Sequence, residues 1–189
     1  MLSFAQQSGV RMTVFDGEDE LYKIASLPNN GKNGFQLLLR LTTDDRASVC
    51  RFSKKFGWYV SLLLTLLYNV DFYMYCFFSP VDEAKHLLEV AKFLNLDVAG
   101  VSFHVGSGCG DAGAYRIALE HTIRVFEEAA ELGFPPLHIV DLGGGFPGEI
   151  DGHCNINHGR SDMPTFPMLA KVIRQELAVF EDRFLKPQI

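Results

Sequence analysis

The sequence lacks any dense block of lysine and arginine. Its 17 basic residues are outnumbered by 23 acidic ones, which gives a net charge of -6 at pH 7. A protein that follows a phosphate backbone needs clustered positive charge, so we do not expect nucleic acid as a partner. With 48% hydrophobic and 21% charged residues in a chain of 189, the composition is that of a soluble globular domain with a sizeable core.

Cysteines are also few, and their spacing forms no CxxC motif. The four stand at Cys50, Cys76, Cys109 and Cys154. Because no signal peptide precedes them, we interpret them as reduced thiols of a cytoplasmic protein rather than a disulfide framework. His153 and His158 flank Cys154, but no second ligand pair accompanies them, so an exposed loop is favoured there and no metal is expected.

Four times along the chain, a short apolar stretch leads through a polar or glycine-containing junction into a helical pattern. This order is typical of consecutive βα units. The strands are expected at residues 10–15, 35–42, 98–105 and 137–142, and the helices after them at 18–25, 44–56, 115–132 and 169–185. Four units predict half of a (β/α)8 barrel, with a small doubly wound sheet as the alternative because strand order is not written in the pattern.

The helical segments carry the expected apolar stripes. In 115–132 the stripe is Ala118, Thr122, Val125, Ala129 and Leu132, and Gly133 follows as the residue just past the end. In 169–185 it is Val172, Ile173, Leu177, Phe180 and Phe184, before the terminating Pro187. Asp44 and Asp45 stand where acidic side chains favour the start of the second helix.

The strand patterns favour the barrel. One face of the second strand carries Phe35, Leu37, Leu39 and Leu41, and the other carries Gln36, Leu38, Arg40 and Thr42. In the third strand, Ser102 and His104 alternate with apolar residues in the same way. Barrel strands pack apolar residues outward against helices and turn polar ones into the mouth at their carboxyl ends, where ligands bind.

Residues 58–78 do not fit the succession of βα units. The stretch has 21 residues, of which only Asp71 is charged, so its length matches one membrane-spanning helix, with basic residues before it as a cytoplasmic flank. Such a helix would divide the barrel between its second and third units. It would also place Asn69 and Asp71 in lipid at considerable cost, so a membrane span is disfavoured.

A second interpretation of this run comes from the genetic code. Val60 and Ser61 are encodable by GTAAGT, a common intron start, and residues 77–79 by a pyrimidine tract ending in CAG, a common intron end. We therefore hypothesise that about 19 residues are a retained intron translated in frame; a spliced messenger that keeps the block in most copies would contradict this. After the block, Ser79 and Pro80 predict the cap and first turn of a new helix.

Two glycine-containing loops directly follow strands. The run 143–148 reads GGGFPG, and adjacent glycines allow successive backbone N–H groups to point at an anion. The earlier loop, Gly106 to Gly108, offers the Ser107 hydroxyl as a second phosphate donor. His104 lies on the inward face, where it can lie against a flat ring bound by that phosphate. The alternatives are a tight turn without a ligand and a histidine that serves only packing.

At this point the motifs resemble a known family. The segments 101–109 (VSFHVGSGC) and 141–148 (DLGGGFPG) resemble the pyridoxal-phosphate barrel of the eukaryotic ornithine decarboxylase family, and the resemblance extends to 9–16, 39–45 and 49–57. It implies pyridoxal 5'-phosphate as cofactor and decarboxylation of L-ornithine to putrescine. It also implies site roles: His104 stacks on the cofactor ring, Arg40 lines the mouth, and the phosphate is bound by Ser107, Gly143, Gly144 and Gly145.

The same resemblance implies what this chain is expected to be without. The family's cofactor-bonding lysine precedes Met1, and the acidic partner of the pyridine nitrogen and the C-terminal β-domain follow Ile189. We therefore expect residues 1–189 to form a partial barrel that is interrupted at 58–78 and is inactive by itself. The resemblance also implies that the full-length proteins of the family form homodimers. Two further functions remain open. They are decarboxylation of another basic amino acid, and binding of antizyme through about residues 1–32, where acidic residues offset Arg11 and Lys23.

Overall fold

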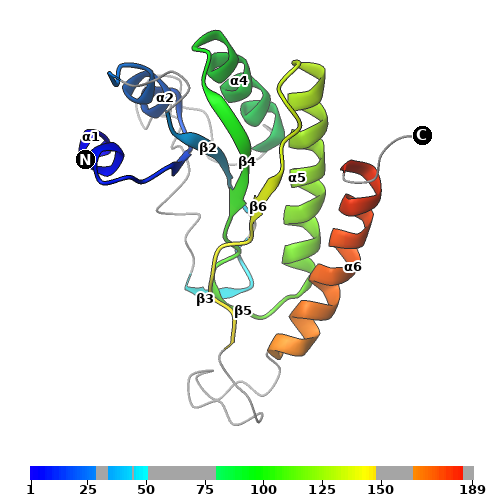
Figure 1. The fold of residues 1–189 in the computed structure, drawn as a ribbon. Coiled ribbons are helices and arrows are strands. Elements are labelled where there is room, and N and C mark those ends of the chain that lie inside the picture. Colours follow the sequence, from blue (N-terminus) through cyan, green and yellow to red (C-terminus); the bar gives the residue numbers. More distant parts are fainter. Residues whose placement is uncertain (29–33, 44, 51–79, 148–163, 185–189) are drawn as a thin grey trace, which may run out of the picture.

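The computed structural model describes residues 1–28, 34–43, 45–50, 80–147 and 164–184 (Figure 1). The run 58–78, the residues Cys76 and Cys154, and the histidines beside Cys154 lie outside the described residues. Within the described part of the chain, no helix has the length and apolar character needed to cross a membrane.

Four parallel strands form one sheet in sequential order. They are β1 (Met12–Phe15), β2 (Gln36–Leu41), β4 (Asp97–Phe103) and β6 (Ile139–Asp141). Each strand lies beside the strand of the preceding βα unit, and the order does not reverse, as it would in a doubly wound sheet. The prediction of a partial (β/α)8 barrel of four βα units is therefore confirmed.

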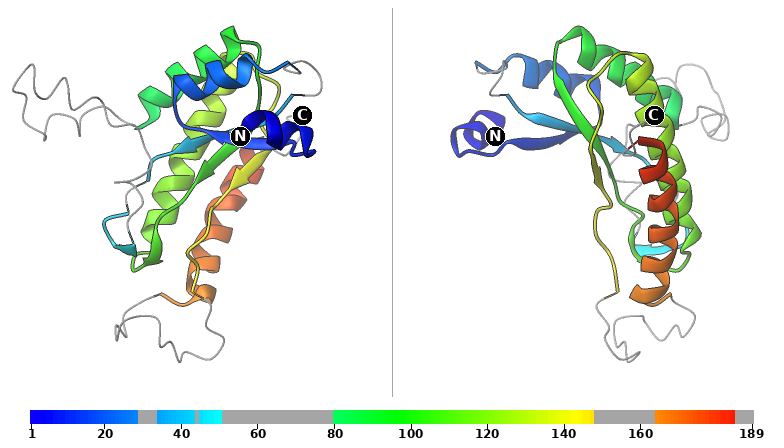
Figure 2. Two further views of the ribbon diagram at one scale, coloured as in Figure 1. Left: turned by 90° about the vertical axis from the view of Figure 1, so that its left-hand side faces the viewer. Right: turned by 45° about the vertical axis from the view of Figure 1, so that its right-hand side comes forward.

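Helices cover one face of this sheet. They are α2 (Glu18–Ala25), α4 (Pro80–Phe93), α5 (Gly113–Glu131) and α6 (Phe166–Phe184), preceded by the short α1 (Leu2–Gln7). Helix α4 contacts β2 and β4, α5 contacts β4 and α4, and α6 packs on α5. The right-hand view in Figure 2 shows α5 and α6 together on one side of the sheet, whereas α1 lies at the β1 end.

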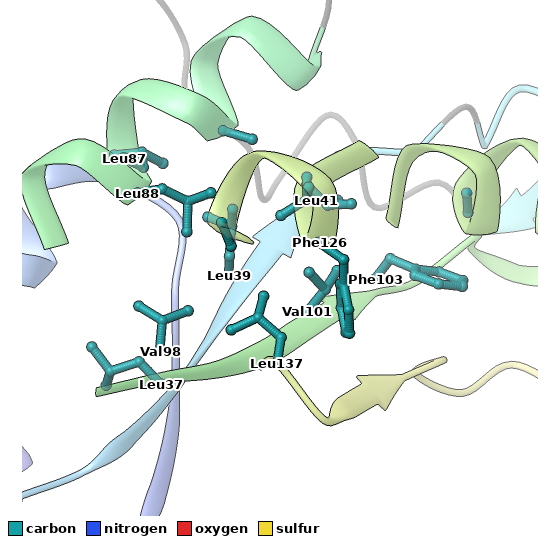
Figure 3. Packing of buried hydrophobic residues seen from close by; sticks show 14 of the residues in the cluster. Leu37, Leu39, Leu41, Leu87, Leu88, Val98, Val101, Phe103, Phe126 and Leu137 are labelled. Carbon is teal, nitrogen blue, oxygen red and sulfur yellow. The ribbon is translucent and has the colours of Figure 1, made fainter. Parts of the chain in front are cut away.

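The core lies between the sheet and these helices. Leu37, Leu39 and Leu41 of β2 are at most 5% exposed and point toward the same layer as Leu88 of α4 and Phe126 of α5 (Figure 3). This is the apolar strand face that the alternation predicted. Burial of these large side chains away from water is the main force that holds the helices on the sheet.

Helix α5 ends as the sequence predicted. Gly133 has a φ of 75°, and its N–H donates to Ala130 O at 2.9 Å, while Phe134 N–H donates to Ala129 O at 3.0 Å. This pair of bonds is the Schellman motif, which needs a residue that adopts a left-handed conformation. Lys92 Nζ, from the end of α4, donates to the Gly133 carbonyl at 2.6 Å and so ties the two helices together.

The predicted helix from Asp44 toward Phe56 is wrong over residues 45–50. Ser48–Cys50 instead forms a short strand, β3, antiparallel to β5 (Ser107–Cys109). Gly110 N–H also donates to Ala47 O at 3.1 Å. Pairing with a loop distant in sequence thus overrides the acidic start signal, which describes only local preference. Residues 51–56 of the predicted helix lie outside the described residues.

Candidate functional site

The site is built where two neighbouring parallel strands end. Strand β4 pairs with β6 up to the Ser102–Asp141 pair, so the chain leaves both strands at the same edge of the sheet. The first loop runs through His104 to Gly108, and the second begins at Leu142. Parallel strands place their carboxyl ends together, and for this reason two loops 30 to 40 residues apart in sequence come into contact.

A polar row crosses the sheet just below these loops. Arg40 of β2 is the register partner of Ser102, which is the register partner of Asp141, so the three lie on one face. The Ser102 hydroxyl donates to Asp141 Oδ2 at 2.9 Å. This is the face opposite to the apolar core, as the alternation of the second and third strands predicted.

Asp141 fixes the start of the glycine loop, a role that the motif analysis did not assign. Its Oδ1 accepts the backbone N–H of Gly143 at 2.8 Å, while its other oxygen holds Ser102. An aspartate that accepts an N–H two residues later forms an Asx-turn, so the Asp-Leu-Gly order was the available signal. One carboxylate therefore joins the sheet to the loop.

The glycine loop lies against His104. A Cβ on Gly143 would stand 2.5 Å from Phe103 O and 3.0 Å from His104 Cβ, and a Cβ on Gly145 would stand 2.8 Å from Gly106 O and 3.2 Å from His104 Cε1. Both glycines also have positive φ, 68° and 82°. The positive φ values and the close contacts with neighbouring atoms therefore both exclude a side chain at these two positions.

Gly144 differs from its neighbours. A Cβ there would meet only His104 Nε2, at 3.6 Å, which is ordinary van der Waals contact. The position is therefore not crowded by the protein, and a side chain would instead fill the space beside the imidazole. Of the three glycines, Gly144 is thus the one at which the described residues leave room for a Cβ.

His104 is held by its own loop. Its Nδ1 accepts the Gly106 N–H at 2.9 Å, so the neutral ring carries its proton on Nε2. Partial burial lowers the pKa of His104 below 6.5, and the positive charge of Arg40 lowers it further, while Asp141 and Asp45 oppose this shift. The ring at neutral pH is therefore an uncharged flat surface, suited to stacking.

Ser107 is half-buried at the start of β5, opposite Cys50. The glycines on each side, Gly106 and Gly108, have φ of 88° and 66°. Ser107 Cα would be 2.9 Å from a Cβ on Gly145, so the serine loop touches the glycine loop. The structure thus brings together His104, Ser107 and the three glycines, with Arg40 in the adjacent polar row.

Aromatic packing anchors the far end of the glycine loop. Phe146 stacks on Tyr115 of α5 with ring centroids 5.5 Å apart, and it meets Phe166 of α6 edge-on at 5.8 Å. On the α6 side of Phe146 lies an apolar cavity of about 400 Å³, lined in part by Leu142 and Ile173. That cavity holds none of the predicted site residues.

Tyr115 couples the glycine loop to the helical layer. It is fully buried at the start of α5. Burial raises the pKa of Tyr115 to about 12, and among the described residues its hydroxyl has no hydrogen-bond partner. The ring is therefore used for its apolar area, and its contact with Phe146 links the loop to the helix that covers β4.

Comparisons with known proteins agree with this geometry. A family model described as "Pyridoxal-dependent decarboxylase, pyridoxal binding domain" matches residues 1–71 and 76–185. Ornithine decarboxylase of Mus musculus is 41% identical over 150 residues, and antizyme inhibitor 2 of Xenopus laevis is 39% identical over 150 residues. Each alignment covers 79% of this chain and 27% of the relative.

A solved structure is also similar. The arginine decarboxylase of Paramecium bursaria Chlorella virus, bound to agmatine, superposes with a TM-score of 0.68 at 30% identity, covering 95% of this chain and 39% of that one. The chain therefore spans 27% to 39% of the length of these proteins.

The crowding at Gly143 predicts a difference between two glycine substitutions. Gly9 has a φ of 83°, and a Cβ added there would meet nothing within 4 Å, so G9A carries backbone strain alone, whereas G143A adds overlap with Phe103 O. We expect G9A to lower the free energy of unfolding by about 1 kcal/mol and G143A by roughly 2–4 kcal/mol. Urea titration measures both, and equal losses would contradict the close packing of the two loops.

The charges around His104 predict opposite pKa changes in two variants. Because Arg40 lowers the pKa of His104 and Asp141 raises it, R40Q should raise that pKa and D141N should lower it. NMR titration of the imidazole protons measures both shifts. His121, whose pKa is lowered by burial and by Arg124, serves as the internal control and should not respond. Shifts of the same sign in the two variants would refute the assigned charges.

The same shift has a consequence for stability. The folded-state pKa of His104 lies below the unfolded value of 6.5, so the unfolded chain binds more protons as the pH falls. Its contribution is present above pH 6.5 and is lost as the pH falls through the lowered pKa. H104Q should therefore weaken the loss of stability on acidification, measured as the free energy of unfolding between pH 7 and pH 5. An unchanged pH dependence in H104Q would contradict this.

Proposed function

This chain belongs to the family of pyridoxal-dependent decarboxylases through its pyridoxal-binding domain, and from that premise we propose that its two strand-end loops bind pyridoxal 5'-phosphate by the phosphate and one ring face. The observation that carries the proposal is the space beside His104 Nε2, into which a Cβ on Gly144 would project. Glycine leaves that space to a ligand, next to a neutral imidazole.

In this proposal the phosphate donors are the Ser107 hydroxyl and the backbone N–H groups of Gly144 and Gly145. The N–H of Gly143 is directed to Asp141, so Gly143 shapes the turn rather than binding the anion. Backbone N–H groups and hydroxyls suit a phosphate because they donate hydrogen bonds without needing a counter-charge. Arg40 adds positive charge to the same mouth.

The proposed reaction is decarboxylation of L-ornithine to putrescine by the whole protein. When bound, pyridoxal phosphate supplies an electron sink for the charge left at Cα as carbon dioxide departs. The residues of this chain hold the phosphate and fix the ring plane, which determines how a bound amino acid is oriented. Ornithine is proposed because mouse ornithine decarboxylase is 41% identical, and arginine is the competing substrate because of the similar viral arginine decarboxylase.

Binding of antizyme is a second candidate function. It is supported by the 39% identity to Xenopus laevis antizyme inhibitor 2. The segment from α1 to β1 also exposes apolar side chains, with Phe4 74% and Met12 39% exposed. Lys23, however, is already paired with Glu20 at 3.5 Å, so little free positive charge is offered there.

The open space at Gly144 predicts an effect on ligand binding without an effect on folding. Pyridoxamine 5'-phosphate is the suitable probe because its amine does not react with surface lysines, and pyridoxamine without phosphate is the control ligand. We expect G144A to weaken binding of the phosphorylated probe roughly tenfold or more, through loss of phosphate hydrogen bonds. Calorimetric titration measures the affinity.

The matched control for this prediction is G17A. A Cβ added at Gly17 would meet nothing within 4 Å, and this glycine is the N-cap of α2, outside the two loops. G144A should retain the melting temperature of the parent chain, and G17A should lower it slightly because alanine is a poorer N-cap than glycine, but only G144A should lose affinity. Equal affinity in G144A, or no preference for the phosphorylated probe, would remove the proposed function.

The antizyme alternative predicts capture by the purified chain. Exposed apolar side chains would form part of such a surface, so F4A combined with M12A should reduce the amount of antizyme retained on immobilised chain. F93A, which removes a ring on α4 that is 83% exposed, is the control and should have no effect. Absence of any retained antizyme on the parent chain would eliminate this function.

A further inference from the structure

Two hydroxyl groups reach from the segment after β2 to the loop after β4. Thr43 Oγ1 donates to the carbonyl of His104 at 2.7 Å, and Ser48 Oγ donates to the carbonyl of Val105 at 2.6 Å. The two acceptors are consecutive carbonyls of the loop that carries the stacking histidine. Ser48 is 6% exposed, so its hydrogen bond is shielded from water.

These carbonyls stand in a gap between two sheets. Strand β4 pairs with β2 as far as Phe103, and the antiparallel pairing of β5 begins at Ser107. Strand pairing therefore does not supply partners for the peptide units between them, although Val105 is fully buried. A buried carbonyl without a partner costs about 1–3 kcal/mol, so the two hydroxyls replace what the sheets do not provide.

The Ser48 contact continues to the imidazole. A Cβ on Gly106 would lie 2.6 Å from Ser48 Cβ and 2.9 Å from Cys50 O, so the Gly106 peptide rests directly on β3. The N–H of that same glycine is the donor to His104 Nδ1 at 2.9 Å. The position of the Gly106 peptide thus sets both the tautomer and the orientation of the ring.

The chain of contacts also reaches the phosphate-binding groups. Gly106 O and Ser107 Cα are the atoms that a Cβ on Gly145 would meet first. A shift of the loop that carries Gly106 would therefore move the Ser107 hydroxyl relative to the Gly145 N–H. Neither Thr43 nor Ser48 belongs to the glycine motifs that predicted the site.

We infer that Thr43 and Ser48 are positioning residues for the cofactor site: by holding the carbonyls of His104 and Val105, they keep the Gly106 N–H on His104 Nδ1 and the ring turned toward the glycine loop. The effect of these two hydroxyls on cofactor binding rests on the proposed function. The two hydrogen bonds, from Thr43 to His104 O and from Ser48 to Val105 O, are called the clamp below and are a property of the chain alone.

The test uses hydroxyl deletions in the full chain with matched controls. T43V and S48A, singly and together, remove the two clamp hydroxyls. T122V and S26A remove hydroxyls that make comparable hydrogen bonds elsewhere, to Ala118 O at 2.9 Å and to Lys23 O at 2.7 Å. T43S restores the first clamp hydroxyl, and circular dichroism establishes that each variant is folded.

The first readout is the ¹⁵N spectrum of the histidine side chains without ligand, in which the His104 signals are those lost in H104Q. We expect a single Nε2–H tautomer in the parent chain, in T43S and in the two control variants, and a mixture of tautomers in the double variant. A folded double variant with the parent His104 spectrum would overturn the inference.

The second readout is binding of pyridoxamine 5'-phosphate. Each clamp hydroxyl removed should weaken binding roughly fivefold, the effect of one hydrogen bond, and T43S should recover the loss. Equal losses in T122V and S26A would overturn a positioning role, as would full affinity in the double variant. If the parent chain does not bind the probe, the proposed function fails, while the ¹⁵N spectrum still decides whether the clamp exists.

Discussion

The contact between the glycine loop and the His104 loop leaves no room for a side chain at Gly143 or Gly145, and the rest of the site depends on it. It exists because β4 and β6 are adjacent parallel strands that end at one edge of the sheet. The apolar layer behind the strands, which includes Leu39, keeps that edge in place. Packing of the core therefore sets the separation of the two loops.

Polar groups then determine how each loop is oriented. Asp141 binds the first N–H of the glycine loop, and Thr43 and Ser48 bind carbonyls of the histidine loop. All these partners are short side chains on or next to strands, so they lose little conformational entropy when they form their bonds. The candidate site is thus supported by short polar side chains from β6, from β3 and from the segment after β2.

Periodic features and motifs could be predicted from the sequence alone. The strands, the α5 stripe ending at Gly133 and the two glycine loops follow from local patterns, because burial on one face imposes a period of two or 3.6 residues. The family followed from motif order, and the family comparison bears it out. These are properties that neighbouring residues encode together.

Features that depend on pairing between distant segments required the tertiary structure. Local signals predict a helix start over residues 45–50, but β5 offers them a strand partner, and that pairing is what makes Ser48 a clamp. The different constraints on Gly143 and Gly144 could not be predicted from the sequence either, because they depend on where His104 and Phe103 O lie in space. Contacts between segments 39 to 61 residues apart leave no local pattern, which is why sequence analysis predicted the residues of the candidate site but not their supports.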